Sequence, residues 1–124
     1  MKPIILLTFC LIIFVIACKK STTYNNTFIG KWKLVETLSD PGDGSGQWQP
    51  VATGTYEFIQ FNTDSTIQSN KYTDFKKYRV PDSVRIEFIR SDGTVFGYRY
   101  KFNQASLEIN PPCIEPCGAR FIKQ

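Results

Sequence analysis

The stretch SVRIEFIRSDGTVFGYRYKF, residues 83–102, decides the fold class. Val84, Ile86 and Phe88 alternate with polar residues in its first half, and its second half alternates in the same way. An Asp-Gly pair at 92–93 lies between the halves. Alternation with a period of two is typical of a half-buried strand, and Asp-Gly favours a tight hairpin turn. We therefore predict an antiparallel hairpin whose apolar side chains share one interior.

Shorter segments with the same alternation lie on both sides of this hairpin, and turn-forming residues separate them. No segment shows the period of a helix. Closing such a meander into a barrel removes its exposed edges. The sequence predicts an all-β fold, a single small antiparallel up-and-down barrel of about eight strands. The predicted strands are 30–36, 55–62, 66–70, 76–80, 83–90, 96–102, 106–109 and 119–123.

Composition limits both the domain count and the chemistry. Residues 28–124 suffice for one domain with one core. The formal charge of +4 is spread along the chain, whereas a nucleic-acid interface needs clustered basic residues. The chain has no histidine, which removes the usual general base and the commonest metal ligand. Because Glu57, Glu87 and Glu108 fall mostly on outward positions, no acid and base pair is expected, and we predict that the chain is not an enzyme.

The N-terminus is typical of a secreted protein. An apolar run at 4–17 follows Lys2 and is shorter than the roughly 20 residues that span a bilayer. Val15-Ile16-Ala17-Cys18 resembles the bacterial lipobox. That resemblance implies that 1–17 is a cleaved signal peptide and that Cys18 carries the lipid. The alternative is an uncleaved signal anchor with a chance cysteine at this position.

Residues 18–27 connect the predicted lipid to the domain. After Cys18 they are polar and lack apolar periodicity, which favours a flexible tether. Two or three acyl chains hold a protein to a membrane almost irreversibly. Surface-exported lipoproteins of some bacteria resemble one another in having acidic residues after the lipid cysteine, and this segment has none. We therefore expect a location in the cell envelope, anchored to the outer membrane and facing the periplasm.

Three segments together resemble the small lipocalin-like lipoproteins of bacteria. They are the opening GKWKLV at 30–35, the loop at 40–46 with Trp48, and the closing CIEPCG at 113–118 with Arg120. The resemblance implies that Gly30 and Trp32 close one end of the barrel, with the guanidinium of Arg120 lying across the indole of Trp32. This cation-π contact is structural. The domain is shorter than lipocalins proper, which favours a filled core.

Two cysteines remain in the domain, Cys113 and Cys117. An even pair in an oxidising compartment predicts a disulfide that restrains the proline-rich corner before the last strand. The alternative is a redox or metal pair. The spacing is not Cys-x-x-Cys, and two cysteines without histidine are too few for zinc, so no metal or cofactor is predicted.

The loop DPGDGSG at 40–46 offers two carboxylates among glycines. We predict a flexible loop over the barrel mouth, which is a common place for recognition. The alternative is a calcium site, but the loop lacks the alternating ligands and distal Glu of an EF-hand.

The aromatic side chains of the strands form the candidate ligand site. As candidates they would line an apolar pocket whose phenol hydroxyls orient a ligand, whereas for any one of these residues the favoured interpretation is that it belongs to the core. The proposed ligand-binding residues are Tyr56, Phe58, Phe88, Tyr98 and Tyr100. Since Tyr56 and Phe58 alternate out of phase with Ile59 and Phe61, a bulge or a covered outer face is also expected there.

Two functions follow from these patterns. The first is a membrane-anchored, lipocalin-like binding protein for a small apolar or amphipathic ligand. The second is a protein-interaction module, an envelope enzyme inhibitor or accessory subunit, with a filled core. An internal cavity above about 300 Å³ favours the first, and an exposed Trp48 or a protruding loop favours the second.

Overall fold

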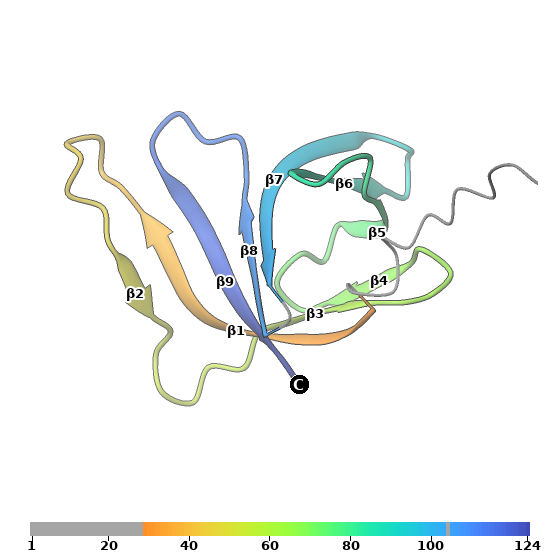
Figure 1. Ribbon diagram of the computed structural model, residues 1–124, viewed down its shortest axis with the longest axis horizontal. Coiled ribbons are helices and arrows are strands. Elements are labelled where there is room, and N and C mark those ends of the chain that lie inside the picture. The colour runs from red at the N-terminus through yellow and green to blue at the C-terminus, as the bar shows by residue number, and fades with distance from the viewer. Residues whose placement is uncertain (1–28, 104) are drawn as a thin grey trace, which may run out of the picture.

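The computed structural model describes residues 29–103 and 105–124, and this part of the chain is all-β (Figure 1). The predicted signal peptide, the proposed lipid site Cys18 and the tether to Thr27 lie outside the described residues. No helix in the described part is long and apolar enough to cross a bilayer.

Nine strands are present in the described residues, and every pairing is antiparallel. Eight of them form a path in the order β4-β3-β1-β9-β8-β7-β6-β5, and β2 pairs only with β1. The strands are β1 (Gly30–Ser39), β2 (Trp48–Pro50), β3 (Phe58–Phe61), β4 (Ile67–Ser69), β5 (Phe75–Arg79), β6 (Arg85–Arg90), β7 (Val95–Asn103), β8 (Ser106–Asn110) and β9 (Cys117–Lys123).

The path curls until its two ends, β4 and β5, meet. A single bridge joins Thr66 to Lys77, and the amide of Tyr78 donates to the carbonyl of Ser65 at 3.0 Å. The seam between β4 and β5 is therefore the weakest joint of the barrel. The predicted up-and-down barrel of about eight strands is confirmed, and β2 is an added strand that the sequence pattern did not predict.

The hairpin predicted at 83–102 is β6 and β7. Phe88 lies opposite Phe96, and Gly93 adopts a φ of 87° at the turn, a conformation that glycine adopts without strain. The prediction that Val84 is an inward residue of this strand was wrong, because Val84 is 60% exposed and precedes β6. The inward positions of β6 start at Ile86.

The core is built from the inward positions of all eight barrel strands. Trp32, Ile86, Phe88 and Phe121 have no exposed surface, and no polar or charged residue among those described is buried. Stacked and edge-on aromatic contacts run through the interior, such as Phe75 against Phe88 at 5.1 Å. These contacts pack the aromatic side chains of β5, β6 and β7 against one another.

Tyr72 joins this core from outside any strand. Its ring stacks near Phe75 and Phe88 and meets the edge of Tyr98, with the ring centroids of Tyr72 and Phe88 5.8 Å apart. Burial raises the pKa of the Tyr72 phenol well above its usual value of 10.0. Tyr72 thus packs beside the β4–β5 seam as part of the core.

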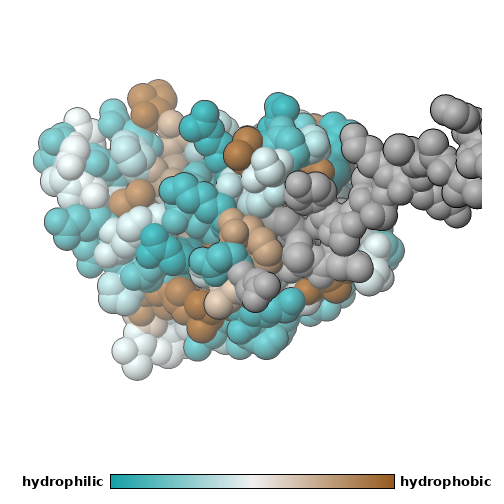
Figure 2. Space-filling view, in the orientation of Figure 1, coloured by the Kyte–Doolittle hydropathy of each residue, from teal (hydrophilic) through white to brown (hydrophobic). Residues whose placement is uncertain are grey.

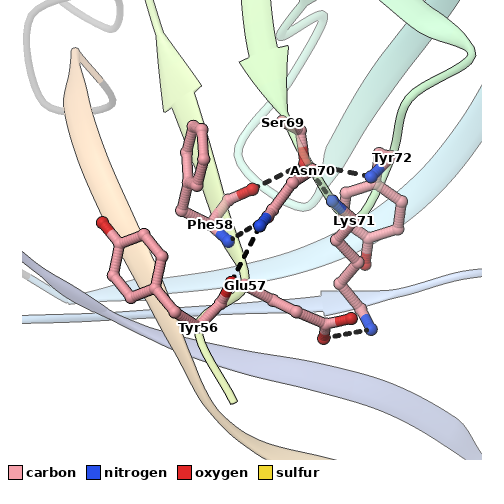
Figure 3. A network of polar contacts seen from close by, with 7 residues as sticks. All are labelled: Tyr56, Glu57, Phe58, Ser69, Asn70, Lys71 and Tyr72. Carbon is pink, nitrogen blue, oxygen red and sulfur yellow. Dashed lines mark hydrogen bonds and ion pairs between the residues drawn. The ribbon is translucent and has the colours of Figure 1, made fainter. Parts of the chain in front are cut away.

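A polar corner holds Tyr72 in place (Figure 3). The side-chain amide of Asn70 accepts from the amide of Phe58 at 2.8 Å and donates to the carbonyl of Tyr56 at 2.8 Å, which extends the β3–β4 ladder. The hydroxyl of Ser69 accepts from the amide of Tyr72 at 2.9 Å. The chain therefore turns sharply after β4 and directs Tyr72 inward.

The predicted stacking of Arg120 on Trp32 was wrong. Trp32 is buried and its indole lies edge-on to Phe102 at 5.8 Å, while the ammonium of Lys123 lies 5.5 Å from the Trp32 ring centroid. Ala119 and Phe121 occupy the inward positions of β9, so Arg120 between them must face outward. A lysine at the strand end takes the place that the resemblance gave to Arg120. Gly30 does begin β1, with a φ of 122°.

Candidate functional site

Two connections meet at one end of the barrel, which we call the tip: residues 40–47 between β1 and β2, and residues 111–116 between β8 and β9. Because β1 and β9 are antiparallel, Ser39 at the end of β1 lies opposite Cys117 at the start of β9. The amide of Asp40 donates to the carbonyl of Pro116 at 3.0 Å, so the two connections are joined by a backbone hydrogen bond.

The β8–β9 connection is a small covalent ring. Cys113 and Cys117 form a disulfide, as predicted, with their Cα atoms 6.1 Å apart. Prolines at 111, 112 and 116 fix the backbone φ angles around the ring. Ile114, inside the ring, is 100% exposed. Figure 2 shows hydrophobic surface at the tip of this connection. The ring therefore presents an aliphatic side chain to solvent on a restrained backbone.

The β1–β2 connection is organised by one carboxylate. Asp40 accepts from the amides of Gly42 at 2.8 Å, Gly44 at 3.1 Å and Gly46 at 2.9 Å. These hydrogen bonds, led by that from Gly42, lower the pKa of Asp40 below its usual value of 3.8. No group of three His, Cys, Asp or Glu side chains in the described residues could hold a metal ion. The geometry supports a self-capped loop rather than a calcium site.

Trp48 lies over β9 on the outer surface of the sheet. The Cζ atom of Arg120 is 4.0 Å from the centroid of the Trp48 ring, and the same guanidinium pairs with Glu36 and, at 3.3 Å, with Glu108. Gly118 lies beneath the indole, where a Cβ atom would come within 2.9 Å of Trp48 Cη2. The indole of Trp48 therefore lies against Gly118 and contacts the Arg120 guanidinium, which the resemblance had assigned to Trp32.

A groove of about 1260 Å³ lies beside this tryptophan. Its walls are the 111–116 connection, residues 97–101 of β7, and Trp48. Arg85 and Arg99 are directly opposite each other on β6 and β7. Arg85 pairs with Asp82 at 3.3 Å, whereas Arg99 forms no ion pair among the described residues. The groove offers an aromatic wall, an aliphatic rim at Ile114 and charges of both signs.

The five predicted ligand-binding residues do not share one site. Phe58 lies directly opposite Lys33 on β1, and Ile59 lies opposite Trp32, so the inward position belongs to Ile59. The prediction of Tyr56 and Phe58 as inward residues was wrong, because both are on the outer face. The phase shift therefore reflects two rings on the outer face, where Tyr56 is 45% exposed, and neither a bulge in β3 nor a cover over this face is present in the described residues.

The other three, Phe88, Tyr98 and Tyr100, are inward as predicted and are engaged with the core. The ring of Tyr98 meets Phe88 edge-on at 5.2 Å, and burial raises the pKa of Tyr98. The hydroxyl of Tyr100 donates to the carbonyl of Asp82 at 3.1 Å. Phe88 is therefore a core residue, whereas Tyr98 and Tyr100 contact the core and also line the groove beside Trp48.

The sequence-based reasoning missed two residues that shape the tip and the core. Gly118 is a glycine inside a strand, a signal that another group approaches the backbone closely. Tyr72 is an aromatic residue in an otherwise polar turn. Neither signal says which residue approaches, because the partner comes from a distant segment.

Comparisons with protein-family models, with curated proteins and with solved structures found no match to this chain.

Proposed function

We propose that this chain is a lipid-anchored protein-interaction module of the cell envelope that binds a partner protein through its tip. The observation that supports this most directly is Ile114, fully exposed within the ring closed by Cys113 and Cys117. Leaving an isoleucine in water forgoes about 1.5–3 kcal/mol of burial free energy. A partner with a small apolar pocket recovers that energy.

The restrained backbone of the ring favours such binding. Association ordinarily costs conformational entropy for each loop that becomes ordered, and a loop that is already restrained loses less. The disulfide and the hydrogen bond from Asp40 to Pro116 both restrain the ring before any partner arrives. Ile114 is then the apolar anchor, and the groove beside Trp48, whose walls include charges of both signs, adjoins it in the interface.

The other function, binding of a small apolar molecule inside the barrel, has less support from the geometry. Two of its five proposed residues, Tyr56 and Phe58, lie outside the barrel, and Phe88, Tyr98 and Tyr100 are used in packing and hydrogen bonding.

The experiment is site-specific photo-crosslinking in intact cells, with a photoreactive side chain at Glu115 of the full chain. We expect one adduct of defined mass that is lost with Ile114→Asp and retained with Ile114→Val. A matched control carries the photoreactive side chain at exposed Val95 on β7. No adduct at Glu115, or an adduct that Ile114→Asp leaves unchanged, contradicts the proposal.

Native mass spectrometry of the chain extracted from its membrane tests the competing function. An apolar molecule that stays bound to the extracted chain, in stoichiometric amount, is the result that would revive the barrel-ligand hypothesis. The same spectra report the acyl chains on Cys18.

A further inference from the structure

A second surface lies at the end of the barrel opposite the tip, where β1 begins and β9 ends (Figure 1). Lys33 of β1 has Phe58 of β3 on one side and Ile122 of β9 on the other, each directly opposite in register. We call the outward side chains of Lys31, Lys33, Tyr56, Phe58 and Ile122 the base surface. Tyr56 is 45% exposed and Ile122 is 44% exposed.

The aromatic groups of the base surface form a cluster under a cation. The ring centroids of Tyr56 and Phe58 are 5.8 Å apart. The ammonium of Lys31 lies 4.1 Å from the Phe58 centroid and 5.3 Å from the Tyr56 centroid. The hydroxyl of Tyr56 donates to the side-chain oxygen of Gln124 at 2.7 Å. Exposed rings with a polar edge and a neighbouring ammonium suit a boundary between apolar and aqueous phases.

The base surface gathers three lysines. Lys31, Lys33 and the adjacent Lys123 form no ion pair among the described residues. The nearby carboxylate of Glu57 is neutralised by Lys71, 3.1 Å away (Figure 3). An anionic surface is therefore the electrostatic complement of this part of the barrel.

We propose that the base surface docks on the anionic headgroups of the phospholipid membrane. Three observations favour this occupant over a protein: the unpaired lysines, the exposed aromatic and aliphatic side chains between them, and the position at the N-terminal end of β1. The expected lipid site, Cys18, precedes Gly30 at the start of β1 by twelve residues, so a chain anchored there enters the barrel at its base end. The observation on the position of β1 rests on the proposed lipid anchoring at Cys18.

Docking at the base gives the domain a defined orientation. The ten residues of β1 cover about 30 Å from the base surface to the tip at 3.3 Å per residue. The exposed Ile114 ring then projects away from the membrane, where a partner can reach it. The base surface and the tip lie at opposite ends of the β1–β9 pair, so membrane docking and partner binding are independent of each other.

The test places a fluorescent reporter in the base surface of the full, lipidated chain in vesicles. Tyr56→Trp introduces an indole at an exposed position, and spin-labelled phospholipids quench an indole that contacts the bilayer. Trp32 is buried and Trp48 is at the tip, and the chain without the substitution supplies their background. We expect strong quenching at position 56 in vesicles containing phosphatidylglycerol and weaker quenching in phosphatidylcholine.

Charge substitutions separate docking from tethering. Each basic residue near an anionic surface raises the ratio of docked to undocked domain about fivefold. Replacing two of them, in the double variant Lys31→Gln with Lys33→Gln, should therefore lower this ratio about 30-fold. Lys76→Gln with Lys77→Gln on β5 is the matched control and leaves quenching unchanged. Circular dichroism confirms folding of each variant.

Two results overturn the proposal. One is an unquenched indole at position 56 in anionic vesicles. The other is equal loss of quenching in the two double variants, which indicates a nonspecific effect of net charge. Neither result bears on crosslinking from Glu115 at the tip, so failure here and failure of the proposed function are distinguishable. The mass of the purified chain reports lipidation separately.

Discussion

Replacing Gly118 with alanine is expected to displace Trp48 and destabilise the domain. A Cβ atom at this position would lie 2.5 Å from Asn110 Nδ2 and 2.9 Å from Trp48 Cη2, both too close for real contacts. The indole and the amide must therefore move. The tip would lose the stacking of Arg120 on Trp48 and the hydrogen bond from Asn110 to the carbonyl of Cys117 at 3.1 Å.

The expected magnitude follows from these two losses. An exposed cation-π contact contributes about 0.5–1 kcal/mol, and a hydrogen bond contributes about 0.5–1.5 kcal/mol. Removing a glycine from the unfolded chain returns about 0.5 kcal/mol. The free energy of unfolding should fall by about 0.5 to 2 kcal/mol, which for a domain of this size lowers the Tm by about 2–16 °C.

Gly97 of β7 is the matched control for Gly118. A Cβ atom there meets only Arg85 Cδ at 3.8 Å, an ordinary contact, so Gly97→Ala should be neutral or slightly stabilising. Thermal unfolding measures stability, and acrylamide quenching of tryptophan fluorescence measures the exposure of Trp48, because Trp32 is buried. If Gly118→Ala and Gly97→Ala behave alike in both assays, the packing argument at the tip is refuted.

Three further predictions concern the core, the pH range and the ring. Tyr72→Ala should lower the free energy of unfolding by about 2–4 kcal/mol because it leaves a cavity among aromatic rings. The control Tyr56→Ala, at an exposed position, should change the free energy of unfolding by less than about 1 kcal/mol. Urea unfolding of the two variants measures the difference. Stability should be flat between about pH 5 and 9, because the chain has no histidine. Because the pKa of Asp40 is lowered in the folded domain, its ionised form contributes stability above pH 3.8, and this contribution is lost as the pH falls through the folded pKa. Because the pKa of Tyr72 is raised, its neutral form contributes stability below pH 10.0, and this contribution is lost at higher pH. Measuring the Tm as a function of pH checks both directions. Reducing the disulfide between Cys113 and Cys117 should lower the free energy of unfolding by at most about 2 kcal/mol, since the loop that it closes is short. Reduction should also make the 111–116 connection cleavable by proteases. If the reduced connection stays uncleaved, the disulfide is not what restrains it.

Period-two alternation determined the class of the fold. It indicated which side of β6 and β7 faces inward, and the Asp-Gly pair located the turn between them. The disulfide also followed from the even number of cysteines in the domain and the expected oxidising compartment. These features depend on neighbouring residues or on chemistry that is independent of the fold, so the sequence by itself was sufficient to predict them.

Tertiary structure decided the facing of β3 and the partner of Arg120. Alternation says which side chains share a face but not which face is inside, and only the register of Phe58 against Lys33 resolved that choice. Arg120 and Trp48 are far apart in sequence and meet because β2 and β9 both pair with β1. Such contacts depend on the register of three strands at once, which no local pattern encodes.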